Sequence, residues 1–244
     1  MRLPSPALKV LAVAALPLAL TACSSDSGTS SSGGTASATS AKPENADAGL
    51  LTGAQLKKAL APASFFPSGF AIDPSGSRDT GDEFQTQATK SAAKPRCADL
   101  GATGWIGLTG IDGVSFAQNS YMNADQTAEL DQEIDVYRGS TATEVMKGLA
   151  KVVAACPSYP DSDTGGKVKV TGVATKGLGD EAYTITLTNP AWEDGTTLVA
   201  VRVDTAVVSV LSTYGGENGA AGAQKLAAHL ALSVEKADKS AQQG

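Results

Sequence analysis

The C-terminal third of the chain alternates between β-branched runs and short groups of turn residues. The dividing groups are rich in glycine, asparagine, aspartate and proline, which favour tight turns. Four strands are therefore predicted, at Lys167–Thr175, Glu181–Thr188, Thr196–Asp204 and Ala206–Tyr214. Because consecutive strands joined by short turns usually pair with each other, we expect these four to form an antiparallel meander.

Two more strands are predicted in the middle of the chain, at Val114–Asn123 and Ala128–Tyr137. The second one alternates with a period of two. One of its faces carries Leu130, Gln132, Ile134 and Val136, and the other carries Glu129, Asp131, Glu133 and Asp135. This pattern is typical of an antiparallel strand with a buried apolar face and a solvated acidic face.

Helical periodicity occurs in three places. A short helix is predicted to start at the capping box Thr52–Gln55 and to stop before Pro62. A longer helix follows a second capping box, Thr141–Glu144, and its apolar stripe ends at Cys156. A last helix is expected over Ala220–Lys236. The order of elements predicts an α+β fold, a mainly antiparallel sheet packed with about three helices.

The first residues have the pattern of a signal sequence. Two basic residues precede an apolar run over Val10–Leu20, about half of the ~20 residues that a membrane-spanning helix needs. Leu20, Thr21 and Ala22 stand directly before Cys23, which resembles the lipobox of bacterial lipoproteins. The resemblance implies that residues 1–22 are a lipoprotein signal peptide and that Cys23 carries acyl chains such as palmitate. An ordinary signal peptide ending in a chance cysteine is the alternative.

Residues 23–49 are predicted to form a disordered tether. After Cys23 the stretch is rich in Ser and Gly and has no aromatic or large aliphatic side chain, so it cannot bury enough apolar surface to order itself. A coil of this kind would span roughly 25–30 Å, and its glycosylation stays open. A single α+β domain is expected over 50–238, with a disordered tail over 239–244.

Cys97 and Cys156 remain as a pair once Cys23 is acylated. An even number of cysteines in an oxidising compartment favours one disulfide, here closing a loop of about 60 residues. A metal pair and a redox pair are the alternatives. Both are disfavoured, because the chain has no C-x-x-C motif and its single histidine, His229, is distant in sequence.

The charge balance narrows the range of partners. The formal net charge is −6, and Lys and Arg do not cluster anywhere in the chain. This argues against nucleic acid as a partner and against electrostatic adhesion to an anionic membrane surface. We therefore expect membrane attachment to depend on the covalent lipid at Cys23.

Motifs for catalysis or metal binding fail on their context. Ser91 to Lys94 matches S-x-x-K without its companion motifs. Asp161 opens a calcium-like loop that lacks the glutamate required at its last position. His229 is the sole histidine, and no G-x-S-x-G motif is present. We expect no catalytic residue, no metal ligand and no cofactor.

Trp192 is the candidate ligand-binding residue. It belongs to a turn sequence, 189–195, that looks like a hairpin tip, where a tryptophan either folds back onto the sheet or faces a ligand. Trp105 is expected in the core. Three phenylalanines would plug one end of the sheet or wall a cleft: Phe65, Phe66 and Phe70.

Several segments together resemble the extracellular sensor domain of PknH-type serine/threonine kinases, a domain also found alone in actinobacterial lipoproteins. They are Cys97–Leu100, Ala154–Pro157, Leu178–Ala182, Val199–Val203 and Val207–Val208. The match would span about Leu50 to Ala237. It implies an α+β fold with a ligand-binding cleft and no enzymatic activity. Members commonly carry more cysteines, so the disulfide scheme transfers in part, and without a kinase this chain is not expected to signal by the kinase route.

Together these features predict a lipid-anchored, extracytoplasmic ligand-binding or sensory domain at the cell membrane. Its ligand would be a small molecule or a cell-wall component, and a membrane protein could be its partner. A carrier of lipid or other apolar molecules across the envelope is the first alternative. Aromatic residues make up 5% of the chain, few for the walls of a large dry cavity. A cell-wall hydrolase is the second alternative.

Overall fold

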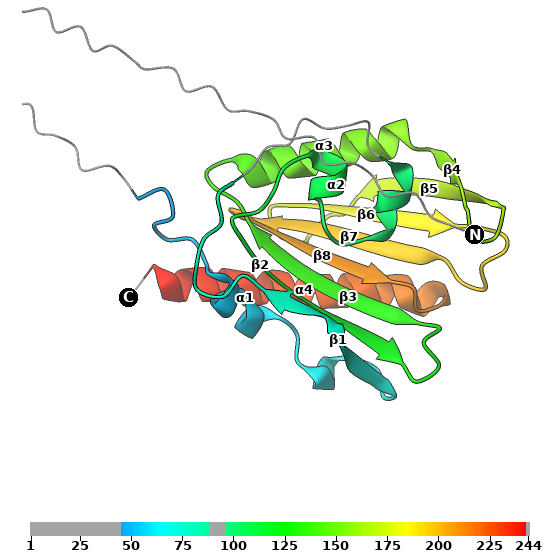
Figure 1. Cartoon of the computed structure of the whole chain (residues 1–244), viewed down its shortest axis with the longest axis horizontal. Coiled ribbons are helices and arrows are strands. Elements are labelled where there is room, and N and C mark those ends of the chain that lie inside the picture. Colours follow the sequence, from blue (N-terminus) through cyan, green and yellow to red (C-terminus); the bar gives the residue numbers. More distant parts are fainter. Residues whose placement is uncertain (1–44, 88–95, 243–244) are drawn as a thin grey trace, which may run out of the picture. The chain divides into compact units, whose positions relative to one another are not determined.

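The computed structural model describes residues 45–87 and 96–242. Within them the strands are β1 (Phe70–Asp79), β2 (Ser115–Asn123), β3 (Glu129–Val136), β4 (Ser158–Pro160), β5 (Lys167–Ala174), β6 (Glu181–Thr188), β7 (Thr196–Val203) and β8 (Ala206–Ser212). The α-helices are α1 (Gly53–Ala59), α2 (Ile106–Thr109), α3 (Thr141–Ala155) and α4 (Gly216–Ala241), with 3-10 turns η1 (Ala63–Phe65) and η2 (Cys97–Gly101) (Figure 1).

All eight strands belong to one antiparallel sheet in the order β1-β2-β3-β8-β7-β6-β5-β4. The sheet consists of two meanders, β1–β3 and β4–β8. They join where β3 pairs with β8, for example at Ile134 opposite Val208. This confirms the predicted α+β fold and the predicted C-terminal meander, whose strand boundaries are correct to within about two residues.

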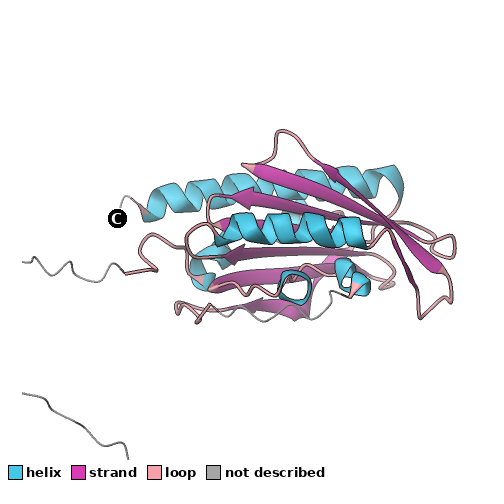
Figure 2. Ribbon diagram, turned by 90° about the horizontal axis from the view of Figure 1, so that it is seen from above, coloured by secondary structure: helices cyan, strands magenta, loops and turns pink. Residues whose placement is uncertain are grey.

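Helices cover the two faces of the sheet (Figure 2). Along β8, Val208 and Val210 lie in the core beneath α1 and α4, whereas Val207 and Leu211 lie in the core beneath α3. Since successive side chains of a strand point to opposite faces, a strand covered on both faces is expected to be apolar at most positions. This accounts for the mainly aliphatic sequences of β7 and β8.

The two predicted capping boxes have different outcomes. At α1 the prediction is confirmed, because the Thr52 backbone N–H donates to Gln55 Oε1 at 2.8 Å and the Gln55 N–H donates to Thr52 Oγ1 at 3.4 Å. At α3 it is wrong. The N-cap is Ser140, and Glu144 instead forms an ion pair with Lys147 at 2.9 Å. The α3 helix itself spans the predicted range.

The ordered domain extends past both predicted ends. Asp47, placed by the sequence in the tether, forms an ion pair with Arg138 at 2.6 Å. At the other end α4 continues to Ala241, so residues 239–241 are helical and not part of a disordered tail. The rest of the tether up to residue 44, with Cys23 and the predicted signal peptide, lies outside the described residues, as do Ser91 to Lys94.

Two strands escaped the sequence pattern. Strand β1 is an edge strand, its register shifts between Asp73 and Arg78, and its burial does not alternate regularly. It also contains Pro74, which is tolerated in a strand where no ladder hydrogen bond is needed. Strand β4 has three residues. Neither strand offers the period of two on which the prediction depends.

The predicted solvated acidic face of β3 is wrong. Glu133 is 6% exposed and Asp135 is 8% exposed. The segment that follows η2 covers them, and the Thr103 hydroxyl donates to Glu133 Oε2 at 2.5 Å. The C-terminal half of β3 is therefore buried on both faces, although one face is acidic, and Glu129 and Asp131 are half-buried.

Candidate ligand-binding cleft

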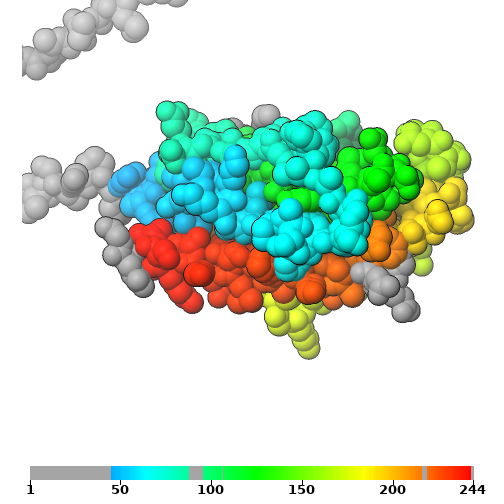
Figure 3. All heavy atoms as spheres, turned by 90° about the horizontal axis from the view of Figure 1, so that it is seen from below, coloured from blue at the N-terminus to red at the C-terminus, as the bar shows by residue number. Residues whose placement is uncertain are grey.

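An open cleft lies at one end of the sheet, where three connections meet. These are the β2–β3 turn, the tip of the β6–β7 hairpin and the segment between β8 and α4, seen in Figure 1 at the start of α4 and in Figure 3 where green, yellow and orange atoms adjoin. The cleft has a volume of about 860 Å³. Its lining includes Asn123, Thr127, Trp192, Thr196, Thr213 and Tyr214.

Trp192 folds back onto the sheet and also lines the cleft. Its backbone N–H donates to the Asn189 carbonyl at 3.0 Å, which closes the hairpin tip. Its indole Nε1–H donates to Asp161 Oδ2 at 2.9 Å, and part of the ring packs against the core beneath α3. The indole is thus held in one orientation while it stays partly exposed to the cleft.

A single carboxylate, that of Asp161, fixes this orientation. Asp161 Oδ2 also accepts hydrogen bonds from Thr164 Oγ1 at 2.7 Å and Asn189 Nδ2 at 2.8 Å, and Oδ1 accepts one from the Asp163 N–H at 3.0 Å. These donors, the Thr164 hydroxyl foremost, lower the pKa of Asp161 below its usual value. The Asp161 carboxylate therefore ties the β4–β5 loop to the tip that carries Trp192.

The calcium-like loop that Asp161 opens is part of this hydrogen-bond network. Its carboxylate oxygens are engaged by N–H and O–H donors of the protein. Across residues 45–87 and 96–242, no three His, Cys, Asp or Glu side chains are grouped so that they could hold a metal ion.

The opposite wall begins at the β2–β3 turn, which Asn123 organises. Asn123 Oδ1 accepts from the backbone N–H groups of Thr127 at 2.8 Å and Ala128 at 3.1 Å, and Nδ2 donates to Thr127 Oγ1 at 2.9 Å. Gln126 adopts a positive φ of 55°, which this tight turn requires. These hydrogen bonds fix the conformation of the turn that brings Thr127 into the lining of the cleft.

Thr213 and Tyr214 complete this wall. Thr213 Oγ1 accepts a hydrogen bond from the Glu129 N–H at 2.8 Å, which extends the β3–β8 pairing by one residue. Tyr214 is 40% exposed, and its ring meets Phe70 edge-on with centroids 5.4 Å apart. An aromatic pair with this geometry restrains the tyrosine ring.

The cleft is acidic at its rim. Glu193 and Asp194 are exposed beside Trp192. The Asp194 carboxylate lies directly against Gly215, which brings the β6–β7 tip next to the segment between β8 and α4. No Lys, Arg or His side chain lines the cleft within the described chain. The site is therefore electrostatically unsuited to anionic ligands.

The three phenylalanines divide between the two predicted roles. Phe66 is buried and stacks on Tyr121 with centroids 3.7 Å apart, which plugs the core beneath α4. Phe70 supports Tyr214 at the cleft. The Phe65 ring packs against the His229 ring of α4, with centroids 4.6 Å apart. This histidine therefore lies outside the cleft.

A second, more apolar pocket lies between η1 and α4. Its volume is about 180 Å³, and its lining includes Phe65, Phe66, Leu130 and Leu226. Tyr214 borders both this pocket and the cleft. Ligand pockets usually have volumes of roughly 300–1,000 Å³, so this one is too small for a lipid-sized molecule.

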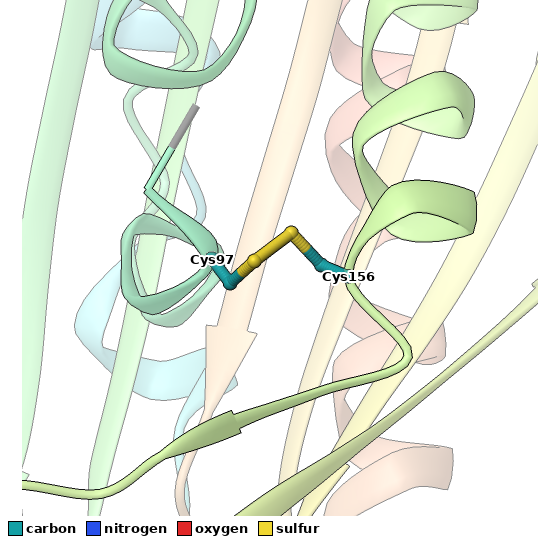
Figure 4. Close-up of a disulfide and its surroundings, with 2 residues drawn as sticks. All are labelled: Cys97 and Cys156. Carbon is teal, nitrogen blue, oxygen red and sulfur yellow. A yellow bond between two sulfur atoms is a disulfide. The ribbon is translucent and has the colours of Figure 1, made fainter. Parts of the chain in front are cut away.

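The predicted disulfide is confirmed. Cys97 lies at the start of η2 and Cys156 at the C-terminal end of α3, with Cα atoms 5.6 Å apart (Figure 4). The bond fastens the segment that begins at η2 to the end of α3. This segment also contains Trp105, which is 2% exposed as predicted.

The same segment covers the acidic face of β3. The carboxyl groups on this face have raised pKa values. Burial raises the pKa of Asp131 to about 7, with the Glu129 and Glu133 carboxylates adding to the effect. Burial also raises the pKa of Glu133, and the pKa of Asp135 lies well above its usual value. Asp135 Oδ2 has no hydrogen-bond partner among the described residues. These groups favour the neutral acid form, which suits a covered protein interior.

Sequence reasoning singled out Trp192 but not the other residues that line the same cleft. Asp161 attracted attention as a possible calcium ligand, although its role in the fold is to orient Trp192. Thr213 and Tyr214 carry no sequence signal, because they approach Trp192 through the pairing of β7 with β8.

No family model matches the chain, and no curated protein matches it either. Among solved structures, the chain is similar to the extracellular domain of PknH from Mycobacterium tuberculosis. The two share 14% sequence identity with a TM-score of 0.49, and the match covers 76% of this chain and 97% of that one. No helix within the described part of the chain is both long and apolar enough to cross a membrane.

Proposed function

We propose that this protein is a lipid-anchored, extracytoplasmic domain that binds a ligand in the cleft beside Trp192 and has a sensory role. In this proposal the lipid on Cys23 holds the domain at the membrane, and a membrane protein receives the signal. Ligand binding would change the packing of the β6–β7 tip that carries Trp192. This tip contacts the β4–β5 loop through Asp161 and the β8–α4 segment at Gly215.

The cleft is the single observation that carries this proposal. Its volume of about 860 Å³ falls in the usual range of roughly 300–1,000 Å³ for ligand pockets. Its aromatic wall is already oriented, since Asp161 holds the Trp192 indole and Phe70 restrains Tyr214. A site ordered before binding loses less conformational entropy when the ligand arrives.

The proposed location is supported by two separate features. The residues before Cys23 resemble a lipobox. The Cys97–Cys156 disulfide belongs to proteins that fold in an oxidising compartment, as the cell exterior is.

The two alternatives have less support. A lipid carrier needs a large dry cavity, whereas the apolar pocket beside Phe65 has a volume of about 180 Å³. A hydrolase needs a nucleophile with a base, and His229 packs on Phe65 outside the cleft. The cleft offers threonine hydroxyls and rim carboxylates instead, which suit recognition.

Native mass spectrometry of the protein purified from its own envelope tests the proposal. We expect a bound mass that is lost or strongly reduced in Trp192→Ala and retained in the control Phe84→Ala, whose aromatic side chain packs on the core beneath α4 and lies outside the cleft. A bound mass of equal occupancy in both variants would place the ligand elsewhere.

Anchoring is tested separately by fractionating cells that express Cys23→Ser. We expect this variant to leave the membrane fraction, whereas Ser30→Ala in the same tether should stay with it. Unchanged detergent partitioning of Cys23→Ser would show that the lipid anchor is wrong.

A further inference from the structure

We infer that the cleft beside Trp192 binds a saccharide, recognised through its ring faces and hydroxyl groups. This inference rests on the proposed ligand-binding function and specifies the chemical class of the ligand. Three properties of the cleft carry it: the aromatic walls, the state of the threonine hydroxyls and the distribution of charge.

The aromatic walls come from two different elements. Trp192 belongs to the β6–β7 tip and Tyr214 follows β8, and both residues line the same open volume. A pyranose ring has apolar C–H groups on its faces and hydroxyls around its edge. Tryptophan and tyrosine rings give a large, rigid surface for such a face at a small cost in side-chain entropy.

The hydroxyls of the cleft have hydrogen atoms to donate. Thr127 Oγ1 accepts a hydrogen bond from Asn123, and Thr213 Oγ1 accepts one from the Glu129 N–H. A hydroxyl can donate one hydrogen bond in addition to those that it accepts. Within residues 45–87 and 96–242 neither hydroxyl donates to a protein acceptor, so each can donate to a ligand oxygen.

The charges favour a neutral ligand. No basic side chain within the described chain lines the cleft, which disfavours phosphates and carboxylates. The carboxylates of Glu193 and Asp194 would attract a cation, but both residues are exposed at the rim. Exposed charges interact weakly because water screens them. Recognition inside the cleft therefore depends on neutral hydroxyls and aromatic faces, and the rim carboxylates can accept hydrogen bonds from sugar hydroxyls.

The experiment follows the tryptophan emission of the full chain in a detergent that has no sugar headgroup. The probes are tetrasaccharides of N-acetylglucosamine, glucose, mannose and galactose, with spermidine as the cation and inorganic phosphate as the anion. The chain has two tryptophans, and Trp105 is buried. We expect one of the saccharides to give a saturable change that is absent in Trp192→Phe.

Calorimetry with cleft variants then locates the binding site. We expect Tyr214→Ala to weaken saccharide affinity by about tenfold, as for an aromatic side chain central to a binding surface. Thr213→Val should weaken it about fivefold, whereas Thr213→Ser, which keeps the hydroxyl that accepts from the Glu129 N–H, should leave affinity unchanged. The matched control Thr171→Val, an exposed threonine on β5, should leave affinity unchanged.

Failure of the inference can be told apart from failure of the proposed function. A Trp192-dependent response to spermidine or phosphate, with none to the saccharides, would overturn the saccharide and keep the ligand-binding function. A non-saccharide mass bound to the envelope protein and lost in Trp192→Ala would do the same. If no probe changes the emission and the envelope protein carries no bound mass, both fall. Equal saccharide affinity in the wild type and Tyr214→Ala would remove the cleft as the site.

Discussion

The acidic face of β3 and the Asp161 corner of the cleft place the same chemical group in opposite environments. Asp135 is 8% exposed, and its Oδ2 has no hydrogen-bond partner among the described residues. Asp161 is partly exposed and accepts hydrogen bonds from four donors. As a result, the pKa of Asp135 is raised by burial and the pKa of Asp161 is lowered by its donors. Burial without donors and partial exposure with four donors therefore shift the pKa values of two aspartates in opposite directions.

The two regions also differ in what they contribute. The acidic face of β3 lies beneath a segment that the disulfide fastens to α3. The stability of this region depends on protonation of its carboxyl groups, such as that of Asp131. The Asp161 corner keeps its negative charge and uses it to orient Trp192. The stability of the acidic face of β3 is therefore expected to respond to pH and reductant. The Asp161 corner is expected to respond to ligand binding.

Reduction of the Cys97–Cys156 disulfide should have the largest effect. Opening a loop of 59 residues costs up to about 4 kcal/mol in the chain-entropy model. We expect the melting temperature to fall and hydrogen exchange to increase first at residues 96–113, which cover the acidic face. Strands within 181–214 should stay protected. Uniform loosening of the whole domain would contradict this local account.

Raising the pH should destabilise the fold. The folded-state pKa of Asp131 is about 7, above its ordinary value of 3.8, so the folded state binds more protons than the unfolded state between these values. The stabilising protonation is therefore complete at low pH and is lost as the pH rises through 7. We expect urea unfolding to show a loss of about 2 kcal/mol from pH 5 to pH 8.

The variant Asp131→Asn tests the source of this loss. It should flatten the pH dependence of the free energy of unfolding. Some dependence should remain, because the charges of Arg78, Asp112 and Glu133 also shift carboxyl pKa values on this face. A pH profile that keeps the wild-type slope in Asp131→Asn would exclude Asp131 as its origin.

Asp135→Asn should stabilise the protein at alkaline pH. Replacing a buried carboxylate by an amide of the same shape removes the cost of burying a charge, which is worth about 1 kcal/mol or more. We expect urea unfolding at pH 8 to show this gain and unfolding at pH 5 to show little change. Destabilisation of similar size at both pH values would contradict this account and would show that the buried amide N–H₂ group finds no acceptor there.

Asp161→Asn should have the smallest effect on global stability. Unlike Asp135→Asn, it should destabilise the protein slightly. It weakens the acceptor for the Trp192, Thr164 and Asn189 donors at a partly exposed site. We expect a red shift of the Trp192 emission with almost no change in the urea midpoint. The matched control Asp163→Asn, whose carboxylate does not contact Trp192, should leave the emission unchanged.

The strand β3 shows how far a sequence pattern leads. Its period of two correctly predicts an antiparallel strand with Leu130 and Ile134 in the core. The same pattern assigns the acidic face to solvent, because alternation with charged residues normally indicates a wet face. The cover comes from a Gly-containing segment about 30 residues earlier in the chain, and no local pattern records that contact.

The cleft shows the same limit. The turn residues 189–195 correctly place Trp192 at a hairpin tip. The sequence leaves open whether the Trp192 ring folds back onto the sheet or faces a ligand. In the structure the Asp161 carboxylate holds the indole against the sheet, and Trp192 still lines the cleft. The calcium-like loop supplies that carboxylate, so this segment has a structural role in orienting Trp192.

By itself the sequence determined the α+β class, the C-terminal meander, the main helices and the Cys97–Cys156 bond, because these depend on local periodicity, turn residues and a count of cysteines. The tertiary structure alone decided that β3 is covered on both faces and that Thr213, Tyr214 and Trp192 share a cleft. Those contacts arise from the pairing of two meanders at β3 and β8 and from a disulfide-fastened cover. Long-range packing of this kind depends on the whole chain, so the few residues around each site could not reveal it.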